Sequence, residues 1–396
     1  MKKEFSLQEK RDYIFILKAL SCLFGNRSTI ETENVDMQNV FKISRDSHIA
    51  NMVSYGINKA GIKLTGDVAS AFEYNRKYML MKDASQFVAQ KKLIDAFESN
   101  GIANLPVKGQ FIKNTYGQPD FRTMSDMDIH IKISDFNKIQ EVLKALDFNV
   151  SLVTQNLILA SQPPFVNLEL HGDNGEFKDT TFGDNLFNVA SLIEGKSYSY
   201  EFSLENHYIY IIEHYAKHFR DVSGMGVRMV CDVYNLYRTY KDKIDFEYVN
   251  DILKKSGTYK FHKMLIEKSK IYFESTLNED SFDALDIFIL SNKIFGTREI
   301  LIHNSNKKFS DTYLENSQKE NYLIHRIFPP RKKMANYYPI LNKAKFLLPF
   351  TWLHRGAKLM LSKNSKAYRQ NIKDYKKYND KEVYDYLKDI MKQAGF

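Results

Sequence analysis

Residues Ser125–Ile131 read Ser-Asp-Met-Asp-Ile-His-Ile, and from Asp126 onward polar and apolar side chains alternate. This period of two is the pattern of a half-buried β-strand, so we expect the carboxylates of Asp126 and Asp128 on one face and the apolar residues in a core. Two neighbouring carboxylates repel each other unless a cation lies between them. Hard oxygen ligands at this spacing suit Mg²⁺ or Mn²⁺, so the pattern predicts a divalent-metal site on this strand.

A phosphate-binding turn is predicted just upstream of the acidic strand. Residues 102–107 favour a short strand, and Lys108-Gly109 ends it in a turn that opens a helix over residues 110–116. A glycine in such a turn lets backbone N–H groups approach a phosphate, and the lysine and the helix N-terminus add positive charge. The order of strand, turn, helix and acidic strand therefore indicates a phosphate site beside a metal site.

A third carboxylate follows on a later predicted strand. Residues 166–171 read Val-Asn-Leu-Glu-Leu-His, and Glu169 and His171 share one face of such a strand. If this strand pairs beside the first acidic strand, three carboxylates converge as in a two-metal centre for phosphoryl or nucleotidyl transfer. His130 and His171 lie further along their strands, where we expect them to hydrogen-bond the metal ligands rather than to bind metal.

The order Lys-Gly, helix, Arg, Ser-Asp-x-Asp resembles the polymerase-beta-like nucleotidyltransferase superfamily, and more closely a bacterial uncharacterised nucleotidyltransferase family that carries Lys-Gly where relatives carry Gly-Ser. In such enzymes the third carboxylate lies in an acid-Leu-His pattern, which residues 169–171 match. The resemblance continues through residues 214–237 and a tail pattern over residues 326–355. It implies an α+β fold in which a small mixed nucleotidyltransferase sheet is flanked by helices, with an N-terminal helical cap and a C-terminal helical region.

The resemblance also implies a reaction and a role for each site residue. The reaction is metal-dependent transfer of a nucleoside monophosphate from an NTP, such as ATP, to an acceptor hydroxyl of unknown identity, with release of pyrophosphate. The expected catalytic and metal-binding residues are Asp126, Asp128 and Glu169. The expected nucleotide-binding residues are Lys108, Gly109, Arg122 and Ser125. For Arg122, an ion pair with the acids when no metal is bound is the alternative interpretation.

Other polar residues leave alternatives open. His214 and His218, one helical turn apart, have the spacing to clasp a metal, but we favour a position lining the substrate cleft. Arg228 and Asp232, four residues apart, fit equally an ion pair that fixes their helix and a contact with the nucleotide. A lone histidine, His48, is expected to be structural.

The chain is long enough for a sizeable core and for several domains. It has 396 residues, of which 43% are hydrophobic and 14% aromatic. Within the first 100 residues we expect helices over 41–57 and 68–99. The expected domains are a helical cap (1–100), the nucleotidyltransferase core (101–200), a helical domain (201–325) and a basic, aromatic-rich helical segment (326–396).

Several features favour a cytoplasmic location. The two cysteines, Cys22 and Cys231, provide neither a disulfide framework nor a zinc-ligand spacing, which favours a reducing compartment. Acidic residues interrupt the first twenty residues, so they make a poor secretory signal. No window offers the roughly eighteen uninterrupted apolar residues of a membrane-spanning helix.

Positive charge is concentrated near the end of the sequence. The net charge is +9, but residues 331–377 hold thirteen Lys or Arg residues against one acid, Asp374, so this segment carries +12 and the remainder is slightly acidic. Contact with an anionic surface, either membrane or nucleic acid, is expected through this segment. The simpler interpretation, which we favour here, is a solvated basic face over packed helices.

Three hypotheses for the activity follow. The leading one is a nucleotidyltransferase that modifies a small molecule, a sugar-like or polysaccharide-pathway acceptor, or another macromolecule. The second is a catalytically inactive nucleotide-binding or scaffold protein with the same fold. The third is an RNA-modifying nucleotidyltransferase that uses residues 331–377, with their interspersed tyrosines, as a track for the RNA backbone.

Overall fold

The structure is a computed structural model that describes most of the chain. The described residues are 4–153, 156–172, 182, 185–222, 224–293, 296–297, 300–305, 322–335, 337–361, 370, 373–374 and 381–396. The chain divides into two compact units. The core unit comprises Lys2–Ala216, Met225–Ile294 and Ala394–Phe396, and the C-terminal unit comprises Lys217–Gly224 and Phe295–Gln393, together with Met1.

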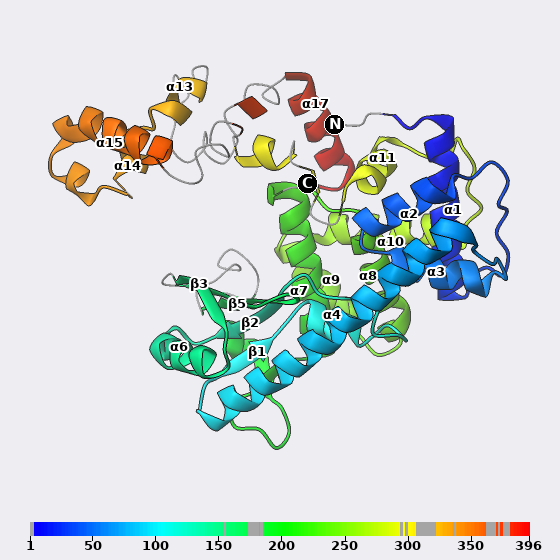
Figure 1. The fold of residues 1–396 in the computed structure, drawn as a ribbon, viewed down its shortest axis with the longest axis horizontal. Helices are drawn as coiled ribbons and strands as arrows, with labels where there is room; N and C mark the ends of the chain where they lie inside the picture. The colour runs from blue at the N-terminus through cyan, green and yellow to red at the C-terminus, as the bar shows by residue number, and fades with distance from the viewer. Residues whose placement is uncertain are drawn as a thin grey trace. The chain divides into compact units, whose positions relative to one another are not determined.

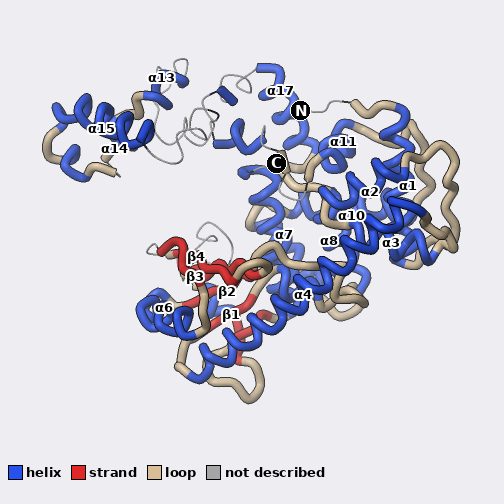
Figure 2. The backbone as a smooth tube through the Cα atoms, in the orientation of Figure 1, coloured by secondary structure: helices blue, strands red, loops and turns tan. Residues whose placement is uncertain are grey.

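The core unit contains a five-stranded mixed sheet in the order β1-β2-β5-β4-β3 (Figures 1 and 2). Its strands are β1 (Asn104–Pro106), β2 (Met127–Ile131), β3 (Asn149–Val153), β4 (Leu157–Gln162) and β5 (Val166–His171). β2 and β5 are parallel, and the other neighbouring pairs are antiparallel. The acidic strand predicted from the period-two pattern is β2, and the predicted strand over 166–171 is β5.

Alternation along β2 and β5 separates a core face from a polar face. Apolar residues of both strands, such as Ile129 and Leu168, pack in one buried cluster with Leu93 of α4 (Gly66–Ser99) and Leu143 of α6 (Phe136–Ala145). Helices α4 and α6 therefore cover this face, as Figure 1 shows. Because successive side chains of a strand point to opposite faces, the acids and histidines of β2 and β5 share the other face.

The expected helical N-terminal region is confirmed. It contains α1 (Leu7–Phe24), α2 (Met37–Asp46) and α3 (Ala50–Lys59), followed by α4. Helix α1 begins at a capping box in which Ser6 and Glu9 exchange hydrogen bonds. The single helix expected over 41–57 is divided between α2 and α3. The reason is His48, whose φ of 55° is left-handed and cannot continue an α-helix.

Helices follow the sheet, as expected. They are α7 (Leu204–Lys217), α8 (Val227–Tyr240), α9 (Phe246–Lys255), α10 (Tyr259–Glu274) and α11 (Ala284–Ser291). Between α7 and α8 lies a π-helical turn, His218–Val222. In the core unit, α10 packs against both α8 and α1, so the helices after the sheet share a core with the first helix of the chain.

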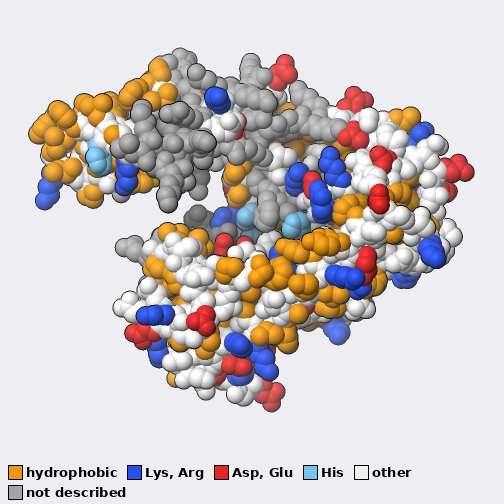
Figure 3. Space-filling model, viewed as in Figure 1, with side chains coloured by type: hydrophobic (Ala, Val, Ile, Leu, Met, Phe, Trp, Pro, Cys, Tyr) orange, Lys and Arg blue, Asp and Glu red, His pale blue; other side chains and the backbone are white. Residues whose placement is uncertain are grey.

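The C-terminal unit is helical where it is described. Its helices are α13 (Tyr322–Ile327), α14 (Arg331–Met334), α15 (Leu348–Leu361) and α17 (Lys381–Gln393). Hydrophobic side chains gather over α14 and α15 (Figure 3). No helix in the described part of the chain combines the length and the apolar character that crossing a membrane requires.

Candidate active site

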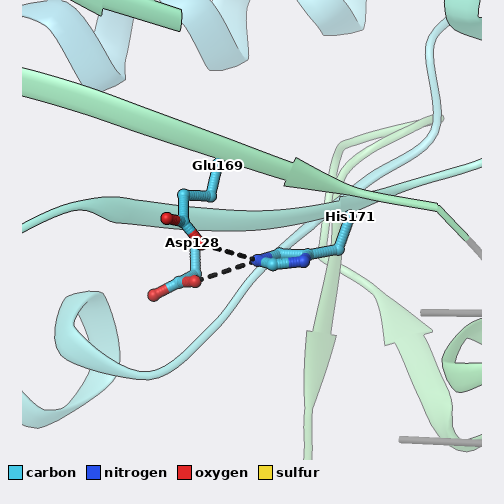
Figure 4. Close-up of side chains that lie close together, drawn as sticks. All are labelled: Asp128, Glu169 and His171. Atoms are coloured by element: carbon cyan, nitrogen blue, oxygen red, sulfur yellow. Dashed lines mark hydrogen bonds and ion pairs between the residues drawn. The ribbon is translucent and has the colours of Figure 1, made fainter. Parts of the chain in front are cut away.

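Strand pairing places the predicted acids together. Asp128 of β2 and Glu169 of β5 are directly paired in the parallel register. Their carboxylate oxygens and a ring nitrogen of His171 all lie within 4.8 Å of one another (Figure 4). His171 Nε2 lies 3.1 Å from Asp128 Oδ1 and 3.5 Å from Glu169 Oε2. Among the described residues, Asp128, Glu169 and His171 are thus close enough together to bind one metal ion.

Asp126 belongs to the same electrostatic environment, although it precedes β2 and is not part of that compact group. Burial raises its pKa, and the charge of Asp128 raises it further. Burial likewise raises the pKa of Glu169, and the negative charges of Asp126 and Asp128 raise it further. The three carboxylates therefore repel one another when ionised, which is the situation that a divalent cation relieves.

Lys108 and Asp128 form a buried ion pair. Lys108 Nζ lies 2.8 Å from Asp128 Oδ1, and both side chains are almost completely buried. Burial opposes a charge on Asp128, but the ammonium of Lys108 and the hydrogen bond from His171 more than offset it and hold the pKa of Asp128 below its ordinary range. The lysine that was expected to bind phosphate thus lies on a predicted metal ligand in this structure.

The Lys108-Gly109 turn has an unusual backbone. Lys108 has a φ of 57°, a region that non-glycine residues adopt rarely and that is frequently associated with functional sites. It precedes α5 (Gly109–Lys113), which is shorter than the helix expected over 110–116. A Cβ atom at Gly109 would lie 2.9 Å from Met124 Cγ, so a larger residue here would force the Met124 side chain or the turn to shift.

Arg122 pairs with a different acid from the ones considered from sequence. Its Nε lies 3.0 and 2.9 Å from the two carboxylate oxygens of Asp232, on α8. The hydroxyls of Tyr116 and Tyr215 also donate to Asp232, over 2.9 and 2.6 Å. The ion-pair partner of Asp232 is therefore Arg122, whereas Arg228 donates a hydrogen bond to the carbonyl oxygen of Thr123.

The remaining predicted residues are spread over several elements. Ser125 is half-buried in the loop before β2, and its carbonyl oxygen accepts a hydrogen bond from Asn167 over 3.2 Å. His130 Nε2 lies 2.8 Å from the hydroxyl of Tyr210, on α7. His214 lies on α7 and His218 in the π-helical turn, and neither is part of the compact ligand group.

The donor set fits a divalent cation. Carboxylate oxygens are the usual ligands of Mg²⁺ and Mn²⁺, and an imidazole nitrogen is a good ligand for transition metals. His171, which was expected only to support the ligands, is therefore close enough to be one. Its place on the same strand face as Glu169 was visible in the sequence, but its distance from Asp128 depends on strand pairing.

Sequence reasoning missed one basic residue near this site, Lys82 on α4. Arg228 on α8 was considered from the sequence, either as an ion-pair partner of Asp232 or as a contact for the nucleotide. The pKa of His48 is lowered to about 3, first by burial and then by the charges of Arg228, Lys82 and Arg122. These cations therefore lie near one another. No local pattern could have revealed this, because they come from three separate parts of the chain.

Comparison with known proteins gives one match. The model of a family described as "Uncharacterised nucleotidyltransferase" matches residues 33–273, which is more than half of the chain. The matched range contains the whole five-stranded sheet, the acids of β2 and β5, and α8. Neither a curated protein nor a solved structure matches the chain.

Proposed function

The chain belongs to the uncharacterised nucleotidyltransferase family, and from this premise we propose that it transfers a nucleoside monophosphate from an NTP to an acceptor hydroxyl and releases pyrophosphate. The single observation that carries the proposal is the in-register pairing of Asp128 with Glu169 on the polar face of the sheet. A nucleotidyl transfer centre needs carboxylates from separate strands at one point, and this pairing supports that arrangement.

In this proposal Asp126, Asp128 and Glu169 hold divalent cations, either Mg²⁺ or Mn²⁺, with His171 as a further ligand. The cations, when bound, neutralise the phosphates and make the acceptor hydroxyl more acidic. The raised pKa values of Asp126 and Glu169 support this assignment, because their mutual repulsion is a cost that a bound cation removes. The buried ion pair of Asp128 with Lys108 keeps that carboxylate ionised and ready to bind.

Glu169 takes the proton of the acceptor in this mechanism. The acceptor oxygen attacks the α-phosphorus while its proton passes to a Glu169 carboxylate oxygen. The bond from the α-phosphorus to the bridging oxygen then breaks, and pyrophosphate leaves. The Glu169 side chain is 35% exposed whereas that of Asp128 is 7% exposed, so an acceptor can approach Glu169.

The residues of the turn and the loop hold the phosphates. Backbone N–H groups at Gly109 and the hydroxyl of Ser125 would donate to phosphate oxygens, and the ammonium of Lys108 would contact the β- and γ-phosphates. Arg122, fixed by Asp232, supplies positive charge for the leaving pyrophosphate. The rare backbone conformation of Lys108 supports a functional role for this turn.

The test is a transfer assay with the purified full-length protein. NTPs labelled at the α-phosphate are incubated with Mg²⁺ or Mn²⁺ and a fractionated cell extract, with Asp128→Asn as the inactive control. The expected result is label in one acceptor fraction and free pyrophosphate, both absent with the variant. Cation-dependent NTP binding without any labelled acceptor would instead identify an inactive nucleotide-binding protein, and label in RNA alone would identify the RNA-modifying alternative.

We further propose that the C-terminal unit contacts an anionic lipid surface on the cytoplasmic side of a membrane. Phe346, Phe350 and Leu353 follow one another at helical spacing and are 76%, 65% and 73% exposed. Residues 331–361 contain seven Lys or Arg residues and no acid. Apolar anchors within a basic surface suit an anionic bilayer, and an exposed leucine offers no ring on which a nucleic-acid base can stack.

Only part of the basic segment supports this proposal. Residues 336, 362–369, 371–372 and 375–377 of the 331–377 segment lie outside the described residues. The cytoplasmic location stays a proposal, and it is supported by Cys22 and Cys231, which are both free and buried.

A further inference from the structure

Arg228 is a buried cation whose hydrogen-bond donors are mostly unused. Its side chain belongs to α8, and the residue is only 4% exposed. Nη2 donates to the carbonyl oxygen of Thr123, but Nε and Nη1 have no hydrogen-bond partner among the described residues. A buried charge with unsatisfied donors is costly, and native proteins rarely retain one without a reason. An anionic ligand that binds at this position would accept hydrogen bonds from these unused donors of Arg228.

The carboxylate of Asp232 does not accept hydrogen bonds from these unused donors of Arg228. Asp232 lies four residues after Arg228 on the same helix, but its oxygens already accept hydrogen bonds from Arg122, Tyr116 and Tyr215. Arg122 and Arg228 both donate to the carbonyl oxygen of Thr123, so the two guanidinium groups lie close together, and the Asp232 carboxylate is hydrogen-bonded to Arg122. Burial and the charge of Arg122 accordingly lower the pKa of Arg228 to about 10.

A third cation reaches the same place from α4. Met79 and Gln86 of this helix both contact the loop before β2: Thr123 Oγ1 lies 3.3 Å from Met79 Sδ, and Gln86 Nε2 donates to the carbonyl oxygen of Met124 over 2.9 Å. Lys82 lies between them on the same helix face, three residues after Met79 and four before Gln86. It is half-buried and makes no ion pair or hydrogen bond within the described part of the chain.

These three cations lie beside the candidate metal site. Thr123, the residue on which both arginines converge, is followed three residues later by Asp126. Burial lowers the pKa of Lys82, and the positive charge of Arg228 lowers it further. The negative charge of Asp126 raises this pKa. A ligand at this position therefore has cations on one side and metal-binding carboxylates on the other.

We infer that Lys82, Arg122 and Arg228 form a pocket for the β- and γ-phosphates of the NTP, beside Asp126. This inference rests on the proposed function for the identity of the ligand. An oligophosphate is the anion that fits, because it is long enough to reach from cations to a metal-bound α-phosphate and carries enough charge for three cations. After transfer, the same pocket holds the leaving pyrophosphate.

The test uses inorganic tripolyphosphate as the probe, in EDTA, with the full-length protein. Calorimetric titration is expected to show saturable binding to the wild type, because the pocket needs no metal. Lys82→Ala and Arg228→Gln are each expected to weaken it by about tenfold or more, as the loss of a charge-assisted hydrogen bond predicts. Lys91→Ala removes an exposed cation of the same helix and is the matched control, with unchanged affinity. Absence of binding to the wild type, or equal binding by all variants, would overturn the inference.

A second measurement distinguishes the triphosphate from other sources of phosphate. With Mg²⁺ present, Lys82→Ala is expected to weaken binding of an NTP by about tenfold and to leave binding of the matching NMP unchanged. Equal losses for both nucleotides, or competition by orthophosphate as strong as by tripolyphosphate, would contradict the assignment to the β- and γ-phosphates.

The two proposals fail in different ways. Tripolyphosphate binding that depends on Lys82, together with a failure to transfer nucleotide to any acceptor, would reject the proposed function and retain the pocket. Nucleotide transfer that persists at the wild-type rate and with wild-type KM for NTP in Lys82→Ala would reject the pocket and retain the function. If Arg228→Gln does not fold, judged by circular dichroism, the half-buried Lys82 alone decides the outcome.

Discussion

Asp128 on β2 and Glu169 on β5 lie directly beside each other in the parallel register of their strands, although α6, β3 and β4 separate them along the chain. Paired residues in a sheet point to the same face, so this register makes the two carboxylates meet. The same register pairs His130 with His171 two residues further on, which sets the distance between His171 and Asp128. The candidate metal site is thus a direct product of one strand pairing.

Glu169→Gln is expected to reduce nucleotide transfer more than nucleotide binding. An amide cannot accept the proton of the acceptor, and the loss of a general base typically costs about 10²–10⁴-fold in rate. Affinity for the NTP should change less, because Asp126 and Asp128 remain as ligands. Steady-state kinetics and NTP titrations provide the measurement, with Glu141→Gln on the exposed side of α6 as the control. A variant that keeps its kcat would exclude Glu169 as the base.

Asp126→Asn is expected to stabilise the metal-free protein near neutral pH. Burial, followed by the charge of Asp128, raises the pKa of Asp126, so the folded state holds this proton more tightly than the unfolded state does. The ionised carboxylate therefore destabilises the fold above its raised pKa, and this effect fades as the pH falls through that pKa. Urea unfolding in EDTA at pH 7 should show a larger free energy of unfolding for the variant than for the wild type.

Urea unfolding in EDTA also distinguishes Asp126 from Asp128, because ionisation of the two carboxylates changes the free energy of unfolding in opposite directions. The pKa of Asp128 is lowered because Lys108 and His171 outweigh the effect of burial, so its stabilising contribution is present at neutral pH and is lost only as the pH falls below the ordinary range of an aspartate. Asp128→Asn should accordingly destabilise the metal-free protein at pH 7, because it leaves Lys108 buried without its partner. Equal effects of the two substitutions would contradict this account.

Asp232→Asn is expected to be strongly destabilising. Asp232 is 1% exposed and is the carboxylate partner of Arg122, with Arg228 next to it. Removing one partner of a buried ion pair typically costs about 3–5 kcal/mol, since the other charge stays buried without compensation. Denaturant unfolding measures the change. Asp251→Asn, which breaks an exposed pair with Lys254, is the control and should cost at most about 1 kcal/mol.

Replacing both Phe350 and Leu353 by serine is expected to weaken binding to anionic vesicles at least tenfold. The two exposed side chains would no longer enter the bilayer, while the basic charge is unchanged. Cosedimentation with vesicles that contain anionic lipid, compared with neutral vesicles, measures the effect. Tyr74→Ser, at a residue of α4 that is 74% exposed, is the control. Salt-sensitive binding to RNA with no preference for anionic vesicles would argue against a lipid partner.

The sequence alone predicted the local elements of the site. The period-two alternation of residues 126–131 predicted β2, and the matching alternation of residues 166–171 predicted β5. Local patterns suffice here because the side-chain period of a strand depends only on its backbone geometry. They also predicted that the acids of each strand would share a face opposite the apolar residues, as the buried cluster beneath β2 and β5 confirms.

Sequence patterns failed where a backbone conformation or a distant charge decided the outcome. The helix expected over 41–57 ended early because His48 adopts a left-handed φ, which apolar spacing does not report. The phosphate contact of Lys108 stays a prediction, but the ion pair that its ammonium forms with Asp128 was not foreseen. A local pattern gives the type of a side chain and its face, but not the opposite charge that it will meet.

The sequence by itself thus determined the family, the two acid-bearing strands and the glycine turn beside them, because these follow from residue order within short segments. Only the tertiary structure decided that His171 joins the carboxylates, that Arg122 pairs with Asp232, and that Lys82 and Arg228 converge near Asp126. The physical reason is that Coulombic and hydrogen-bonding partners are set by distance in space, and here they come from α4, α8 and two strands that the chain brings together only on folding.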